Sequence, residues 1–187
     1  GIRDPDGDWS SDVSLPILFP DYIIGDLDSI KTVALNYYKD RKVSILQYPP
    51  EKDYTDTEIA VNKAIDLGAT EIVLLGCTGS RIDHLFGNIG MLLKCLKLGV
   101  SCVIKDDNNT IFLTETSTKI RGSLGKTFSI IPYSEEISDL TIIGAKYPLD
   151  NYKMKIGSAI GISNVFEEDE VKIEFNSGRI LIIYPTD

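Results

Sequence analysis

The first half of the chain alternates short apolar runs with segments of helical periodicity. The apolar runs, each followed by a polar turn, are residues 22–24, 43–46 and 72–75, with two further runs at 103–104 and 110–113. The helix-like segments are residues 29–39, 55–67 and 82–98. Short continuous apolar runs are typical of parallel strands that are buried on both faces, so the alternation predicts βαβ units.

The pattern changes beyond residue 117, where only short strand-like runs remain. These runs are residues 128–131, 140–143, 159–162, 171–175 and 180–184. Asn176-Ser177-Gly178 lies between the last two runs and predicts a hairpin loop of three residues. The second half therefore predicts an antiparallel sandwich or barrel.

Composition and charge narrow the classes of function. Of the 187 residues, 43% are hydrophobic and 25% are charged, as in an ordinary globular protein with a buried core. The net charge of -9 argues against general binding of nucleic acid, which needs clustered Lys and Arg. No apolar run reaches the roughly 18 residues of a membrane span, and residues 1–12 are too polar for a secretory signal. The three cysteines form no CxxC pair, so we expect reduced thiols in a cytoplasmic protein.

Two acidic turns follow the first two predicted strands. Asp26 and Asp28 are two residues apart, so an extended backbone presents both carboxylates on the same side. Asp53 and Asp56 follow the next strand. The carboxyl ends of neighbouring parallel strands meet at one crevice, so these carboxylates predict a Mg²⁺ site whose shell is completed by substrate phosphates.

Each acidic turn also has a purely structural interpretation. Asp28 or Ser29 is a good N-cap for the helix that follows. Thr55 and Glu58 have the spacing of a capping box, and Asp56 in the first helical turn benefits from the helix dipole. Taken singly, neither turn is diagnostic of metal binding.

The turn at residues 76–83 has the features of an anion site. Gly76 and Gly79 permit close approach by the backbone, and the helix that follows offers free N–H groups at its N-terminus. Arg81 carries a guanidinium that matches phosphate oxygens, and Asp83 either orients a group of the site or forms a cap ion pair.

Two polar residues lie further along the same predicted helix. His84, the only histidine, has no nucleophile motif around it, so we expect it at the surface or in packing. Asn88 either faces the crevice or is a buried amide with its hydrogen bonds satisfied.

Four motifs, taken in order and spacing, carry a family resemblance. They are Gly25-Asp26-Leu27-Asp28-Ser29-Ile30, Lys52-Asp53-Tyr54-Thr55-Asp56, Gly76-Cys77-Thr78-Gly79-Ser80-Arg81-Ile82-Asp83-His84 and Gly161-Ile162-Ser163-Asn164. From about Asp21 to the C-terminus, the chain resembles the thiamine pyrophosphokinase family of the bacterial type. Members of that family transfer the pyrophosphoryl group of ATP to thiamine, which gives thiamine diphosphate and AMP.

The resemblance implies a fold class and an assembly. It implies an α/β fold in which an N-terminal nucleotide-binding domain with a parallel sheet, residues 1–115, is followed by a C-terminal antiparallel β-sandwich, residues 116–187. The second domain would bind thiamine and form a homodimer. The substrates would be thiamine and ATP, with Mg²⁺ as the cofactor, and neither nucleic acid nor a membrane would be a partner.

The resemblance also implies roles for individual residues. The catalytic set would be Asp26, Asp28, Asp56 and Arg81, of which the three aspartates would hold Mg²⁺. The ATP phosphates would be bound by Asp53, Thr55, Thr78, Gly79, Ser80, Arg81 and Asp83. Ser163 and Asn164 of the partner subunit would contact the pyrimidine ring of thiamine. Alternatively, these two residues form the polar end of the strand expected at residues 159–162.

The sequence departs from the family in one respect and leaves two other hypotheses open. Family members carry a first strand and an Asp-Gly-Gly turn upstream of the first motif, and this sequence lacks both, so we expect a truncated or incompletely represented form. Asp-Leu-Asp after a strand also resembles haloacid-dehalogenase-type phosphatases, with Asp106-Asp107 as their later acidic motif. The third hypothesis is a thiamine- or nucleotide-binding module without catalysis.

Overall fold

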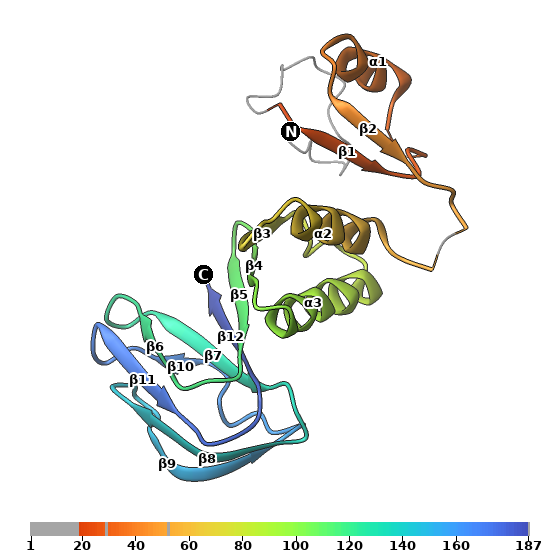
Figure 1. The fold of residues 1–187 in the computed structure, drawn as a ribbon. Coiled ribbons are helices and arrows are strands. Elements are labelled where there is room, and N and C mark those ends of the chain that lie inside the picture. Colours follow the sequence, from red (N-terminus) through yellow and green to blue (C-terminus); the bar gives the residue numbers. More distant parts are fainter. Residues whose placement is uncertain (1–18, 29, 52, 187) are drawn as a thin grey trace. The chain divides into compact units, whose positions relative to one another are not determined.

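The computed structural model describes residues 19–28, 30–51 and 53–186 and divides into two compact units (Figure 1). The first unit is Gly1–Ala60 and the second is Val61–Asp187. Ser29 and Lys52, which belong to two of the motifs, lie outside the described residues.

The first unit contains a βαβ element, as the sequence predicts. Its elements are β1 (Tyr22–Gly25), α1 (Thr32–Asp40) and β2 (Ser44–Gln47). β1 and β2 pair in parallel, with Tyr22 opposite Ser44 and Gly25 opposite Gln47. The next helix, α2 (Asp56–Asp66), begins in this unit and ends in the second. The parallel pairing therefore brings the turns after β1 and β2 to the same edge of this small sheet.

The second unit opens with a further βαβ element, which leads into a large mixed sheet. The elements are β3 (Glu71–Leu75), α3 (Ile82–Lys97), β4 (Ser101–Lys105) and β5 (Asn109–Thr114). β3 and β4 are parallel, whereas β5 is antiparallel to β4. α3 packs on one face of the sheet, where Leu92 and Cys95 join the apolar side chains of β4 and β5 in one core cluster.

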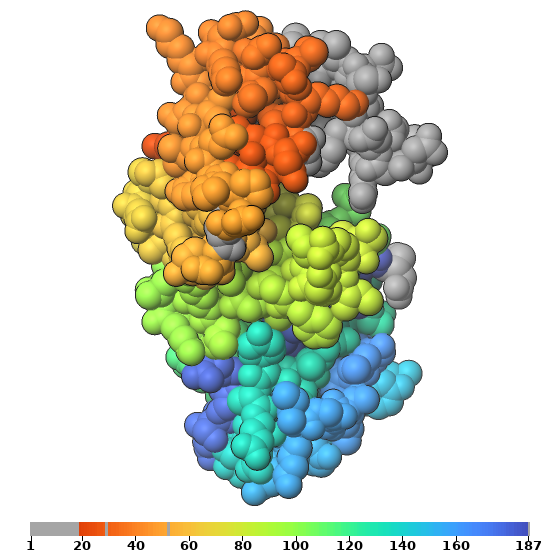
Figure 2. Space-filling view, turned by 90° about the vertical axis from the view of Figure 1, so that its right-hand side faces the viewer, coloured from red at the N-terminus to blue at the C-terminus, as the bar shows by residue number. Residues whose placement is uncertain are grey.

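The remaining strands build an antiparallel sandwich, which confirms the prediction for the second half. They are β6 (Thr118–Arg121), β7 (Thr127–Pro132), β8 (Glu136–Ile143), β9 (Leu149–Lys155), β10 (Asn164–Val165), β11 (Glu170–Glu174) and β12 (Ile180–Pro185). One layer has the order β6-β11-β8-β9, and the other is part of a six-stranded sheet of order β10-β7-β12-β5-β4-β3. Phe128 and Phe166, with ring centroids 4.8 Å apart, lie in the core between the layers. Figure 2 shows the green surface of the helical layer of this unit meeting the teal and blue surface of its sandwich.

In the second unit, a single mixed sheet joins parallel strands to the sandwich. The parallel pair β1-β2 belongs to the first unit, and the parallel pair β3-β4 belongs to the second. β4 continues through β5 into β12 and β7, so one sheet crosses the predicted boundary at residue 115. The reason is that β5 reverses direction after β4 and then accepts the last strand of the chain as its neighbour.

Two local predictions are wrong. Asn176-Ser177-Gly178 does not close a hairpin, because β11 pairs with β6 and β8 whereas β12 pairs with β5 and β7. Ser138 N–H donates to Ser177 O over 3.1 Å, so this segment is held by β8 as it crosses between the layers. Residues 159–162 form a turn and no strand, since Ile162 N–H bonds back to Ala159 O over 3.1 Å.

Candidate active site

The turn after β1 is a tight reversal built around the first pair of aspartates. Gly25 O accepts from Tyr48 N–H over 2.9 Å at the end of the β1-β2 pair. Asp26 Oδ1 then accepts from the N–H of Asp28 over 3.2 Å, and Leu27 between them has φ +65°. A leucine rarely adopts a positive φ, so the turn that carries the two aspartates has a strained backbone.

The carboxylate of Asp56 lies against the end of β1. A Cβ built on Gly25 would be 2.9 Å from Asp56 Oδ2, and Gly25 has φ +153°. Only glycine leaves both the conformation and the space that the carboxylate needs. The first unit thus brings Asp56, from the start of α2, beside the residue that precedes Asp26.

The turn before α2 has the capping geometry that the sequence predicts. Thr55 Oγ1 accepts from the N–H of Glu58 over 3.2 Å, which satisfies one of the free donors at the start of the helix. Asp53 is exposed in the same turn. The structural role of Thr55 is therefore confirmed, and a contact of Thr55 or Asp53 with phosphate stays a prediction.

The glycine turn between β3 and α3 is held from inside the second unit. Gly76 has φ +69°, and a Cβ at Gly79 would meet nothing within 4 Å. Asn88 is buried, and its Nδ2 donates to Cys77 O over 2.9 Å. Of the two interpretations of Asn88, the buried and hydrogen-bonded amide is the correct one.

Arg81 and Asp83 form a bidentate ion pair at the start of α3. Arg81 Nε donates to Asp83 Oδ1 over 3.2 Å, and Nη2 donates to Asp83 Oδ2 over 2.5 Å. The hydrogen bond from Arg81 lowers the pKa of Asp83 to about 2, and the same bond raises the pKa of Arg81. Both side chains are about two-thirds exposed, so the guanidinium is presented at the surface in its charged form.

Asp106, in the turn after β4, is a neighbour of the glycine turn that the sequence reasoning missed. Its Oδ1 accepts from the N–H groups of Asn108 and Asn109 over 2.7 and 2.5 Å. Burial raises the pKa of Asp106, but hydrogen bonds from the Thr78 hydroxyl, Asn108 and Asn109 outweigh burial and lower it overall. The signal that predicts this contact is the parallel pairing of β3 and β4, which brings the turns after both strands together.

Asn164 has a structural role within the sandwich. Its Nδ2 donates to Tyr147 O over 2.8 Å, and its Oδ1 accepts from Tyr147 N–H over 3.0 Å and from Val165 N–H over 2.9 Å. Ser163, which precedes it, has φ +55° and donates its N–H to Ser129 Oγ over 3.1 Å. Asn164 is 2% exposed, and most of the hydrogen bonds of its amide fix the backbone of Tyr147.

The Tyr147 ring itself remains accessible, and the sequence reasoning did not single it out. Tyr147 is 54% exposed, and Lys146 Nζ lies 5.5 Å from its ring centroid. A buried amide thus fixes the backbone under an exposed aromatic ring. No spacing rule predicts this arrangement, because Asn164 and Tyr147 are 17 residues apart in the chain.

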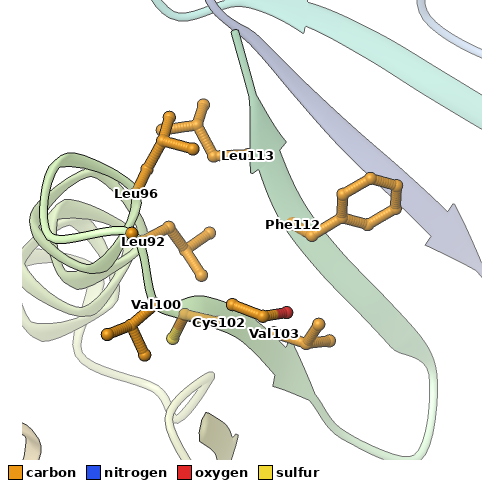
Figure 3. A pocket seen from close by; sticks show the side chains of 9 residues that line it. Leu92, Leu96, Val100, Cys102, Val103, Phe112 and Leu113 are labelled. Atoms are coloured by element: carbon orange, nitrogen blue, oxygen red, sulfur yellow. The ribbon is translucent and has the colours of Figure 1, made fainter. Parts of the chain in front are cut away.

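One apolar hollow of the second unit lies away from the predicted site residues. It has a volume of about 340 Å³ and lies between the C-terminal part of α3 and strands β4 and β5 (Figure 3). Its walls include Leu92, Leu96, Cys102 and Leu113. None of the predicted site residues lines it, so it has no part in the predicted chemistry.

The predicted site residues fall into three groups. Asp26, Asp28, Asp53, Thr55 and Asp56 belong to the first unit, the residues from Thr78 to Asp83 belong to the turn before α3, and Ser163 and Asn164 belong to the sandwich. Among the described residues, no three His, Cys, Asp or Glu side chains form a group that could hold a metal. Convergence of the groups on one ATP molecule therefore stays a prediction.

Comparison with known proteins decides the family. A model described as "Thiamin pyrophosphokinase, catalytic domain" matches residues 14–104, and one described as "Thiamin pyrophosphokinase, vitamin B1 binding domain" matches residues 110–180. Thiamine pyrophosphokinase of Bacillus subtilis is 33% identical over 172 residues, which are 91% of this chain and 80% of that protein. The chain belongs to the thiamine pyrophosphokinase family.

Solved structures of thiamine pyrophosphokinases share the fold. The crystal structure from Bacillus subtilis superposes with a TM-score of 0.83 at 31% identity and covers 91% of this chain and 80% of that one. The structure from Geobacillus thermodenitrificans has a TM-score of 0.76 at 32% identity and covers 89% of this chain and 76% of that one.

Among the sequence relatives, thiamine pyrophosphokinase 1 of rice is 31% identical, and the chain spans 66% of its length. The two family models meet between residues 104 and 110. The domain boundary that the sequence predicts at residue 115 stays a prediction.

Within the described residues, no helix is both long and apolar enough to cross a membrane. The three cysteines, Cys77, Cys95 and Cys102, are free.

Proposed function

We propose that the chain transfers the pyrophosphoryl group of ATP to the hydroxyl of thiamine and releases thiamine diphosphate and AMP. The observation that carries the proposal is that both parts of the chain match one enzyme family, the catalytic part first and the vitamin B1 binding part second. The similarity to thiamine pyrophosphokinases of Bacillus subtilis and rice supports it.

The donor set in the first unit suits Mg²⁺. Asp26, Asp28 and Asp56 offer only carboxylate oxygens, which are the ligands that this hard cation prefers. The contact of Asp56 with Gly25 keeps its carboxylate beside the turn that carries the other two. These three aspartates would hold Mg²⁺ together with the phosphates of ATP, which would complete its shell; in the described residues the three carboxylates do not by themselves form a group that could hold the ion. The ion would neutralise charge on the phosphates.

The glycine turn and Arg81 would receive the phosphates of ATP. Backbone N–H groups at the start of α3 and the fork of Arg81 are donors of the kind that bind phosphate oxygens. Arg81 is already ordered by Asp83, so less side-chain entropy is lost when a phosphate replaces or joins that carboxylate. The positive groups would then stabilise charge that develops as AMP leaves.

The reaction would be an in-line displacement at phosphorus. The thiamine hydroxyl oxygen forms a bond to the β-phosphorus of ATP, the bond from that phosphorus to the oxygen of the α-phosphate breaks, and AMP departs with the electron pair. The hydroxyl proton is lost late, to a carboxylate or to water. Positioning and charge neutralisation are expected to supply most of the rate enhancement, as in phosphoryl transfer generally.

The sandwich would supply the thiamine site. The exposed ring of Tyr147 offers an apolar face for stacking, and such a face also attracts a cationic ring such as the thiazolium of thiamine. Asn164 would act through the backbone of Tyr147, and Ser163 remains a candidate contact to the pyrimidine. A homodimer and a cytoplasmic location also stay proposals, the latter supported by the three free thiols.

One assay tests the proposal against its alternatives. The protein is incubated with ATP, Mg²⁺ and thiamine, and the products are separated by chromatography. Equal amounts of AMP and thiamine diphosphate are expected, and neither should form without thiamine. Release of phosphate from a simple monoester without ATP would indicate a phosphatase instead, and ligand binding without AMP would indicate a binding module. Asp56→Asn should abolish Mg²⁺-dependent AMP formation in a folded protein, and wild-type turnover by this variant would refute the metal assignment.

A further inference from the structure

Asn88 is a buried polar side chain within the apolar stripe of α3. It is 8% exposed and shares the buried face of the helix with Leu92 and Cys95, four and seven residues further on. A buried amide costs free energy unless its polar atoms are hydrogen-bonded. Its Nδ2 donates to the carbonyl oxygen of Cys77 in the glycine turn over 2.9 Å, which stabilises its position.

This hydrogen bond sets the orientation of the peptide that joins Cys77 to Thr78. The described chain contains no cis peptide, and a trans peptide is planar, with its C=O and N–H pointing in opposite directions. Because Cys77 O points toward Asn88 on α3, the N–H of Thr78 points away from that side chain.

The N–H of Thr78 is available to a ligand. Neither a carbonyl oxygen nor a side chain among the described residues accepts a hydrogen bond from it. Gly79, the next residue, leaves open space where a side chain would stand, so an anion can approach the backbone closely at this point. Successive backbone N–H groups in such a turn are good donors to phosphate oxygens.

We propose that Asn88 is a positioning residue for ATP: by holding Cys77 O, it aims the N–H of Thr78 at a phosphate oxygen. The inference rests on the proposed function, since it deepens the role of the glycine turn. Asn88 contacts no substrate and acts only through the backbone of this turn.

Two variants of Asn88 test the proposal. Asn88→Leu keeps a side chain of similar size in the apolar stripe and removes the donor, and Asn88→Asp keeps the shape but sets an oxygen against Cys77 O. The dissociation constant for ATP with Mg²⁺, measured by calorimetry, should rise about ten-fold or more, the value of one hydrogen bond to a charged group. The KM for thiamine should change by less than about two-fold, because the sandwich is untouched.

A matched control separates positioning from packing. Cys95→Ala alters a fully buried side chain on the same stripe of α3, away from the glycine turn. It should lower the unfolding temperature and leave the affinity for ATP unchanged.

The outcomes distinguish the inference from the proposed function. Wild-type affinity for ATP in either folded Asn88 variant would overturn the role of Asn88. Equal weakening of ATP and thiamine, with a matching loss of stability, would also overturn it, because that is the result of a merely structural role. A wild-type protein that binds ATP but forms no AMP would refute the proposed function, while the comparison of ATP affinities would still decide the role of Asn88.

Discussion

Replacing Gly25 by alanine is a direct test of the contact between β1 and Asp56. The added Cβ would stand 2.9 Å from Asp56 Oδ2 and 3.2 Å from its Cγ. The backbone φ of +153° is also one that residues with a Cβ rarely adopt. The substitution therefore strains the turn and pushes away the carboxylate that we assign to Mg²⁺.

The size of both effects follows from the geometry. Backbone strain of this kind costs about 1 to 3 kcal/mol of folding stability. Restoring an ordinary contact of 3.4 Å moves the carboxylate by about 0.5 Å, and since a displacement of about 1 Å can cost about 100-fold in rate, we expect about a ten-fold loss of kcat.

The assay compares Gly25→Ala with Gly68→Ala in AMP formation over a range of Mg²⁺ concentrations. Gly68 also has a positive φ, +88°, but a Cβ there would meet nothing within 4 Å. The control should lose about 1 kcal/mol of stability and retain wild-type kcat. A folded Gly25→Ala protein with wild-type kcat and wild-type Mg²⁺ dependence would show that the position of Asp56 does not matter for the reaction.

Three further predictions concern other parts of the chain. Tyr147→Ala should raise the KM for thiamine about ten-fold, whereas Tyr152→Ala, at a less exposed tyrosine of β9, should leave it unchanged in the same kinetic assay. The pKa of Asp83 is lowered from 3.8 to about 2, so its ion pair with Arg81 should stabilise the protein above pH 4. This stabilisation should be lost as the pH falls toward 2. An NMR titration of Asp83 with a midpoint near 4 would contradict the prediction. Burial raises the pKa of Cys102 to about 12, so iodoacetamide should label it at least about 100-fold more slowly in the folded than in the unfolded protein at pH 8, as read by mass spectrometry.

Much of the local structure was predictable because it depends on neighbours in the sequence. The helical periods at residues 55–67 and 82–98 correspond to α2 and α3, and the apolar run at residues 72–75 corresponds to β3. The cap of Thr55 on Glu58 follows from a spacing of three residues. The role of Gly25 in a turn was predictable from the sequence. The carboxylate that lies next to it belongs to Asp56, 31 positions further on, and that contact was not predictable from local sequence.

The errors occurred where a local rule competed with distant contacts. Asn176-Ser177-Gly178 has good hairpin chemistry, yet Ser138 binds Ser177 and Asn176 Nδ2 donates to Asp139 Oδ2 over 2.8 Å. Those bonds direct the chain into the other layer of the sandwich. Residues 159–162 have apolar character but turn back on themselves close to β7, where Ile130 N–H donates to Gly161 O over 2.9 Å.

The sequence by itself determined the periodicity of the helices and strands, the turn chemistry and, through four spaced motifs, the family. The tertiary structure decided which strands are neighbours: β12 lies between β5 and β7, so the last strand of the chain completes a sheet that β3 and β4 begin. It also decided that the amides of Asn88 and Asn164 serve carbonyls 11 and 17 residues away. The physical reason is that a period or a cap depends on residues a few positions apart, whereas strand order and buried hydrogen bonds depend on which distant groups satisfy one another when water is excluded.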